Sequence, residues 1–274
     1  MAHSAWHSSD LVHRVTDRRA VFNAISLLTT LKSPTFVWRG HVSSNWTLNP
    51  AVHRKRDLKS QGQILDDQLT LIESARDRRH DHLDGWRMPD LALLARLQHN
   101  GAATLLTDVT TDPFVALYFA CERSSSFDQG DGLLLAIDVA STGKHPRTKH
   151  YDLAHEADLE EVLLDLDGRL GLYTPPDVSP RIMAQRGRFV FGDYRDLKYT
   201  TLPIHRSDWN AEKLEKVFSP ERGHGQPPKP AIVAIEIKAS LKPQLRDILD
   251  QSFGMTGITL FPDLHGFAAA HRVW

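Results

Sequence analysis

The sequence predicts a single domain of mixed α+β structure, with helices flanking one central sheet, and three observations support this fold class. The chain has 274 residues, a length at which one domain with insertions is the default. Stretches with apolar residues at helical spacing alternate with short runs of β-branched and aromatic residues. The composition, 41% hydrophobic and 24% charged, is that of an ordinary globular protein.

The composition also indicates which cellular compartment and which kinds of partner to expect. Cys121 is the single cysteine, so no disulfide forms within the chain, which is typical of a reducing compartment such as the cytoplasm. The net charge of -1 gives no general attraction to polyanions. No segment approaches the ~20 apolar residues of a membrane span, so we expect no membrane partner. The sequence lacks HExxH, and one cysteine cannot build a zinc ribbon, so no metal site is expected.

Residues 10–32 are predicted to form the first helix. Apolar residues such as Val21, Ile25 and Leu28 recur there at helical spacing, and Asp10 is placed to cap the helix start. Pro34 ends the segment. The sequence therefore predicts an N-terminal helical segment over residues 1–34 and the main domain over residues 35–274.

The main domain is predicted to alternate strands and helices. Residues 133–139 are uniformly apolar until Asp138, which indicates a central strand. Residues 221–230, rich in glycine and proline, indicate a surface loop. The other predicted strands are 35–40, 103–106, 188–191, 231–237 and a terminal one starting at 257–261. The predicted helices are 61–84, 89–99, 114–121, 159–166 and 243–251.

Arg39 stands out because it lies inside an apolar strand. A buried charge is costly unless it is paired, and the planar guanidinium suits a phosphate or a carboxylate. Gly40 beside it permits close approach of a ligand or of backbone. Two interpretations are even at this point: Arg39 serves a ligand, or it holds an internal carboxylate such as Asp108.

Three further segments carry candidate site residues. Thr110 and Thr111 lie in a polar turn that opens a helix, where free amides bind anions, although simple capping by Thr111 or Asp112 is the favoured interpretation. Gln185 precedes a predicted strand, with Gly187 leaving room beside it. Asp263 is at the tip of a predicted turn and either joins the site or organises the turn. Motifs for dinucleotide folds, P-loops and serine hydrolases are absent from the sequence.

Taken in order, these segments resemble the FRG domain family, named for a Phe-Arg-Gly-like strand. That strand corresponds to residues 37–41, and the tryptophan, leucine and proline of residues 46–50 follow it. Residues 98–120 are similar to the longest family motif, which runs from a Gln-His pair through an Asp-x-Thr turn into an Asp-Pro helix. Residues 185–189 and 257–264 resemble the Gln-x-Gly-x-Phe signature and the C-terminal end of the family.

A more distant resemblance, to ADP-ribosyltransferases, implies a chemistry and a fold. It implies a central, mainly antiparallel sheet and NAD as the cofactor. Gln185 takes the position of the superfamily's glutamate, and a neutral amide there bonds a ribose hydroxyl but cannot act as a general base. The carboxylates available to substitute are Asp108, Glu122 and Asp263. The implied catalytic residues are Arg39, Gln185 and Asp263, and the implied NAD-binding residues are Arg39, Gly40, His41, Trp46, Thr110 and Thr111.

The resemblance thus predicts an enzyme that breaks the nicotinamide bond of NAD and transfers ADP-ribose to a macromolecule. The acceptor is a nucleic-acid base or a protein side chain, and a toxin or anti-phage role fits such an activity. Two alternatives stay open. One is a non-catalytic module that binds a ligand or nucleic acid in the same cleft, and the other is an NAD glycohydrolase with water as the acceptor.

Overall fold

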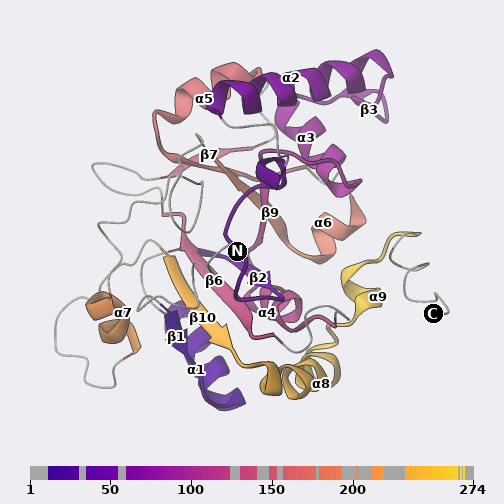
Figure 1. Cartoon of the computed structure of the whole chain (residues 1–274). Helices are drawn as coiled ribbons and strands as arrows, with labels where there is room; N and C mark the ends of the chain where they lie inside the picture. The colour runs from indigo at the N-terminus through magenta and orange to yellow at the C-terminus, as the bar shows by residue number, and fades with distance from the viewer. Residues whose placement is uncertain are drawn as a thin grey trace.

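Figure 1 shows the computed structural model of the chain. The structure describes residues 12–30, 35–54, 60–123, 130–140, 148–152, 157–176, 179–192, 202, 211–218, 232–264, 266 and 268. The predicted loop at 221–230 lies outside these residues. Among the described helices, none combines the length and the apolar character needed to cross a bilayer.

One eight-stranded sheet organises the fold, as the sequence predicts. The pairs at its two ends, β1 with β10 and β7 with β8, are parallel, and all pairs between them are antiparallel. The predicted central strand is confirmed, because β6 pairs with both β10 and β2. In sheet order the strands are β1 (Val12–Arg14), β10 (Ile232–Ile237), β6 (Gly132–Asp138), β2 (Phe36–His41), β5 (Thr107–Thr110), β9 (Gly187–Phe191), β8 (Leu170–Tyr173) and β7 (Thr148–Tyr151).

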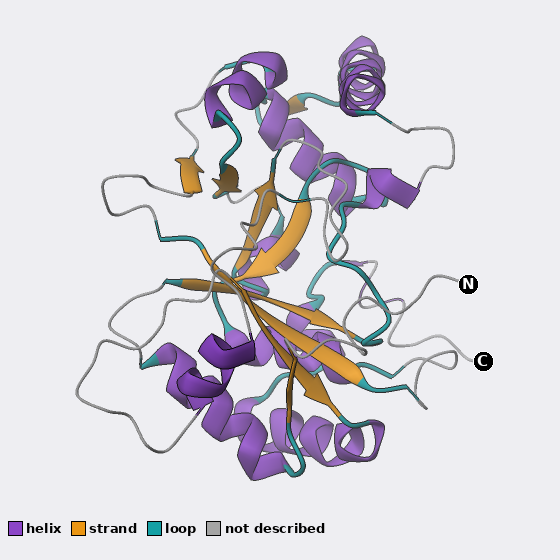
Figure 2. Cartoon of the chain, turned by 60° about the vertical axis from the view of Figure 1, so that its left-hand side comes forward, coloured by secondary structure: helices purple, strands orange, loops and turns teal. Residues whose placement is uncertain are grey.

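Helices lie on both sides of this sheet (Figure 2). In Figure 1, α2, α3 and α5 gather at one end of the molecule and α1 and α8 at the other. A short hairpin, β3 (His82–Leu83) and β4 (Trp86–Arg87), follows α2. The helices are α1 (Arg18–Thr29), α2 (Gln61–Asp77), α3 (Asp90–His99), α4 (Pro113–Cys121), α5 (Leu159–Leu166), α6 (Pro180–Ala184), α7 (Ala211–Phe218), α8 (Lys242–Phe253) and α9 (Gly257–Leu260), with 3-10 turns at Ala51–Arg54 and Ala239–Leu241.

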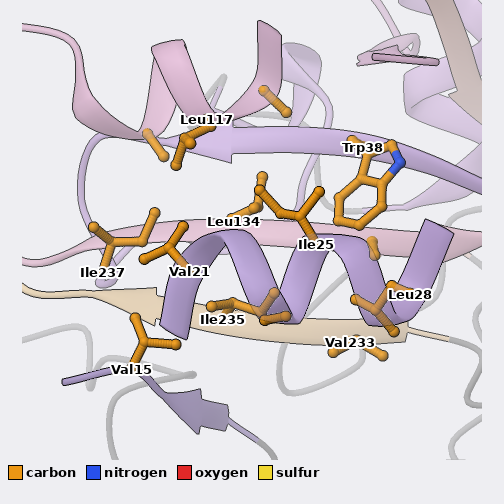
Figure 3. Packing of buried hydrophobic residues seen from close by; sticks show 14 of the residues in the cluster. Val15, Val21, Ile25, Leu28, Trp38, Leu117, Leu134, Val233, Ile235 and Ile237 are labelled. Atoms are coloured by element: carbon orange, nitrogen blue, oxygen red, sulfur yellow. The ribbon is translucent and has the colours of Figure 1, made fainter. Parts of the chain in front are cut away.

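The core forms where apolar helix faces meet the sheet. Val21, Ile25 and Leu28 recur at helical spacing on α1, and Figure 3 shows them against strand residues such as Ile235. Strand alternation sends Val37 to the opposite face, where it joins a second apolar cluster. A third cluster fills the space between α2, α3, α5 and strands β8 and β9.

The N-terminal prediction is partly wrong. Residues 12–14 form β1, which pairs with β10 through Val12 and Ala234, and the helix begins only at Arg18. Asp17 caps the helix, because its carboxylate accepts from the amide of Ala20 at 2.9 Å, and Asp10 lies outside the described residues. Pairing with a distant strand overrides the helical pattern here, so this segment joins the same sheet as the rest of the domain.

Three other boundaries differ from the prediction. Helix α2 ends at Asp77 instead of residue 84, because the chain turns through left-handed backbone at Arg79 and again at Asp84 and Gly85. Residues 107–110, predicted as a turn, form β5, whereas residues 103–106 do not form a strand. Residues 257–260 form helix α9 instead of a strand, since Thr256 starts a capping box. Strands β7 and β8 and the short helix α6 were not predicted from the sequence.

Two glycines bring α4 unusually close to the sheet. A Cβ atom on Gly40 of β2 would lie 1.9 Å from the carbonyl oxygen of Ala116 and 2.6 Å from the nitrogen of Ala120. A Cβ atom on Gly132 of β6 would lie 2.4 Å from the carbonyl oxygen of Ala120. The helix backbone therefore rests directly on two neighbouring strands. Gly40 permits close approach of backbone, one of the two roles the sequence allowed for it.

We expect Gly40→Ala to lower the free energy of unfolding by about 3 kcal/mol or more, since the added methyl overlaps helix backbone that cannot move aside. Gly62→Ala is the matched control, because a Cβ there meets nothing within 4 Å and lies in helix α2. That control should keep or raise stability by up to about 1 kcal/mol. Urea unfolding of both variants measures the difference, and equal midpoints would contradict the packing described.

Candidate functional site

The sheet is opened at the seam between β2 and β5. The register between these strands is a single pair, Trp38 with Thr110. Beyond it the guanidinium of Arg39 replaces the backbone ladder: its Nη1 donates to the carbonyl oxygen of Asp108 at 2.5 Å. Its Nε donates to Nε2 of His41 at 3.0 Å. A side chain thus bridges the two halves of the sheet where strand pairing stops.

A cavity of about 380 Å³ lies at this seam. Its volume falls within the range of about 300–1,000 Å³ that small-molecule sites occupy. Strands β2, β5 and β9, helices α3, α4 and α6, and the segment after α9 all contribute to its walls. The lining residues are Trp38, Arg39, Gly40, Val42, Trp46, Gln98, His99, Asp108, Val109, Thr110, Val115, Ala116, Phe119, Glu122, Arg181, Ile182, Gln185, Gly187, Arg188, Phe189 and Phe261.

Arg39 is a cavity residue and not the partner of a buried carboxylate. Its side chain is 20% exposed, whereas that of Asp108 is 64% exposed, with 3.7 Å between Nη1 and the carboxylate. Burial lowers the pKa of Arg39 and the Asp108 charge opposes that shift, but the group stays protonated because arginine titrates so far above neutrality. The guanidinium keeps N–H donors beyond the two that bond His41 and the Asp108 carbonyl, and these can meet a ligand.

His41 supports Arg39 instead of lining the cavity. It is 2% exposed, and burial together with the Arg39 charge holds its pKa well below the usual range. The imidazole is therefore neutral and accepts the Arg39 Nε–H, which orients the guanidinium. Trp46 lines the cavity, is 40% exposed, and places its ring 6.0 Å from that of His41.

The two threonines of the β5–α4 turn differ in position, since Thr110 lines the cavity and Thr111 does not. Thr110 lines the cavity, and its hydroxyl donates to the carbonyl oxygen of Gln185 at 2.7 Å. Thr111 is exposed and lies outside the lining. Asp112 caps α4 by accepting from the amide of Phe114 at 2.9 Å. The turn thus ties β5 to the end of α6 and carries its own cap, as the capping interpretation expected.

Gln185 faces both the cavity and the C-terminal segment. It ends helix α6, lines the cavity and donates from Nε2 to the carbonyl oxygen of Leu260 at 3.0 Å. Within the described residues its Oε1 atom has no hydrogen-bond donor, so this oxygen remains able to accept from a ligand hydroxyl.

The placement of Asp263 does not support a catalytic role. Asp263 lies outside the lining, and Arg181 clasps it with two hydrogen bonds, from Nε at 2.7 Å and from Nη2 at 2.9 Å. The amide of Gly266 adds a third bond at 2.8 Å. The Arg181 hydrogen bonds hold the pKa of Asp263 at about 2, so it is a fixed counter-ion that fastens the C-terminal segment to α6.

A serine, a histidine and an aspartate meet near this clasp without forming a hydrolase triad. The hydroxyl of Ser179 lies 3.3 Å from Nε2 of His99, and the Asp263 carboxylate lies 3.8 Å from the same Nε2 atom. A triad needs the serine and the carboxylate on opposite ring nitrogens. Ser179 also caps α6 through the amide of Arg181, which is a structural role.

Several lining residues were missed as site candidates. Arg188 of β9 pairs with Val109 of β5, and Arg39 belongs to β2, the strand on the other side of β5. Strand alternation predicts this only after the register is known. Phe119 lies one turn after Val115 on α4, and His99 belongs to the Gln-His pair at residues 98–99, which was the available signal. Glu122, which the sequence named as a substitute carboxylate, directly follows α4 and also lines the cavity. In the described part of the chain, no three His, Cys, Asp or Glu side chains cluster to hold a metal ion.

Among known proteins, one family model matches part of the chain. The sequence model of the FRG domain matches residues 34–129, a stretch that runs from just before β2 to just beyond α4 and holds Arg39, Gly40, Thr110 and Glu122. No curated protein and no solved structure matches the chain.

Asp263→Asn should lower the melting temperature by a few degrees at pH 7. Asp263 has a depressed folded-state pKa, so its stabilisation is present above the unfolded pKa near 3.8 and is lost as pH falls through about 2. The gap between wild type and variant should therefore close in acid. Asp250→Asn on exposed α8 surface is the control and should track wild type throughout. A gap unchanged at pH 2.5 would contradict the ion-pair assignment.

Proposed function

We propose, on the premise of the FRG-domain match, that this chain is an ADP-ribosyltransferase-like enzyme that binds NAD at the β2–β5 seam. The observation that carries the proposal is the convergence of Arg39, Thr110 and Gln185 on one cavity from segments distant in sequence. These are residues that the resemblance assigned to NAD. The supporting observations are the charges and rings that surround them.

Two arginines suit the pyrophosphate. Arg39 of β2 and Arg188 of β9 both line the cavity, from the two strands that neighbour β5. No described carboxylate lies within ion-pair distance of Arg188, whose Nη1 bonds the neighbouring carbonyl of Gly187. A dianionic linkage bridging both guanidinium groups would gain charge-assisted hydrogen bonds from each.

The rest of the cavity suits a ribose and a flat ring. Trp46, Phe119 and Phe261 contribute aromatic surface on which a nicotinamide or adenine ring can stack. The free Oε1 of Gln185 can accept from a ribose hydroxyl. As the bond from the ribose to nicotinamide breaks, positive charge grows on the ribose, and ADP-ribose then passes to a nucleic-acid base or a protein side chain.

A non-catalytic ligand-binding module is the second candidate, and one observation favours it. Two of the predicted catalytic residues are engaged within the fold: Gln185 donates to Leu260, and Asp263 neutralises Arg181. Such a module would use the same arginines and rings and would leave the ligand intact.

We expect NAD to raise the melting temperature of the wild-type protein. A ligand that binds only the folded state adds about 2.7 kcal/mol at a hundredfold excess over Kd. Arg39→Ala should abolish this rise and lower the ligand-free melting temperature by only a few degrees, because Asp108 is exposed and no buried charge is stranded.

Arg78→Ala is the control, since the Arg78 side chain bonds only Ser74 on the exposed face of α2. It should keep the full NAD response. A wild-type melting temperature unmoved by millimolar NAD would reject the proposal, and an NAD response retained by Arg39→Ala would remove Arg39 from the site.

A further inference from the structure

Glu122 is a cavity-lining carboxylate that has no hydrogen-bond or ion-pair partner among the described residues. It directly follows α4, is half-buried and lines the cavity. Val115, Phe119 and Glu122 recur at positions i, i+4 and i+7, so they share the helix face that forms this wall. Because the backbone of α4 packs directly on Gly40, the distance between this helix face and β2 is fixed.

The fold does not stabilise the negative charge of Glu122. The carboxylate lies at a helix C-terminus, where the exposed carbonyl ends repel anions. Within the described residues, no hydrogen bond or ion pair reaches it, whereas Arg246 donates to the neighbouring carbonyl of Cys121 at 2.7 Å. Burial raises the pKa of Glu122, and its charge helps to raise that of Tyr118 one turn earlier. A group kept in such a costly environment is a functional-site candidate.

The other two carboxylates near the site are less suited to chemistry. Asp263 is outside the lining and fully engaged by Arg181. Asp108 lines the cavity, but its side chain is 64% exposed and its carboxylate already has a cation, Arg39, at 3.7 Å. Glu122 alone of the three combines cavity lining, partial burial and the absence of a cation partner in the described residues.

We propose that Glu122 is the catalytic base of the transfer reaction, an inference that rests on the function proposed above. In this step the bond between the ribose C1′ and the nicotinamide nitrogen breaks, and its electron pair leaves with nicotinamide. The acceptor oxygen or nitrogen forms a bond to C1′, and its proton passes to the Glu122 carboxylate. Gln185 takes the position of the superfamily's glutamate but cannot act as a base. In this assignment Glu122, at the end of α4, supplies the base instead.

Several titratable and charged groups surround Glu122 and shape its pH response. Its own helix supplies Tyr118, and Arg123 follows in the chain. The remaining ones are Lys242 and Arg246 of α8 near the helix end, His41 of β2 behind Arg39, and the cavity residues Arg39, Asp108, His99, Arg181 and Arg188.

Glu122→Gln keeps the shape of the side chain and removes its charge. The variant should bind NAD with the same rise in melting temperature as wild type, but cleave it about 100-fold or more slowly, because proton transfer to a positioned base is lost. The wild-type rate should rise with pH as Glu122 ionises, and this limb should be absent in the variant. Glu122→Asp, which keeps a carboxylate, should recover part of the rate.

A second readout needs no turnover. A carboxylate whose folded pKa is raised destabilises the fold above its unfolded pKa, so ligand-free Glu122→Gln should melt higher than wild type at pH 7. The two proteins should melt alike near pH 4, where both side chains are neutral. Glu73→Gln, an exposed change on α2, is the matched control and should leave melting and turnover unchanged.

The outcomes separate the two proposals. Slow cleavage with intact NAD binding and a raised melting temperature at pH 7 supports Glu122 as the base. Wild-type cleavage matched by Glu122→Gln, or no gain in its melting temperature, overturns the role of Glu122 while the transferase proposal stands. A wild-type protein that neither binds nor cleaves NAD overturns both.

Discussion

The contact between the backbone of α4 and the glycines at positions 40 and 132 sets the geometry of the site. Because neither strand residue has a side chain there, the helix lies against β2 and β6 at a distance no other residue would allow. That contact places the start of α4 beside Thr110 and its end, with Glu122, against the same cavity that Arg39 lines. One steric condition thus links the strand, the turn and the helix of the matched FRG stretch.

The cavity lies where the pairing between β2 and β5 ends, beside the packed helix α4. Strand pairing stops after Trp38 and Thr110, and the Arg39 side chain takes over by bonding the Asp108 carbonyl. Arg39 therefore has two roles inside this apolar strand. It donates to a backbone carbonyl that has no strand partner where the ladder is open, and it keeps further N–H donors for a ligand. On the opposite wall, Gln185 and the Arg181–Asp263 pair fasten the C-terminal segment so that Phe261 closes the cavity.

The sequence predicted what depends on local pattern and missed what depends on distant pairing. Helices α3, α4 and α5 and strand β6 follow from periodicity and caps, and they occur where expected. The sequence of β1 predicts a helix, because its pairing with the distant β10 is not visible in the local pattern. The polar sequence of β5 likewise predicts a turn. Among site residues, Arg39, Thr110 and Gln185 were identified from motif position. Glu122 was named only as one of three substitute carboxylates, and its position in the cavity follows from the packing of α4 on the sheet. Arg188 was not identified, because its position depends on the register of β9 with β5.

We propose that NAD is bound and cleaved in the cavity at the β2–β5 seam. The most direct test incubates the protein with NAD carrying one label on nicotinamide and another on the adenosine, together with cell extract or nucleic acid. We expect the nicotinamide label to be released while the adenosine label becomes attached to a macromolecule, and we expect Arg39→Ala to abolish both. Recovery of both labels in intact NAD, from a wild-type protein shown to be folded, would contradict it.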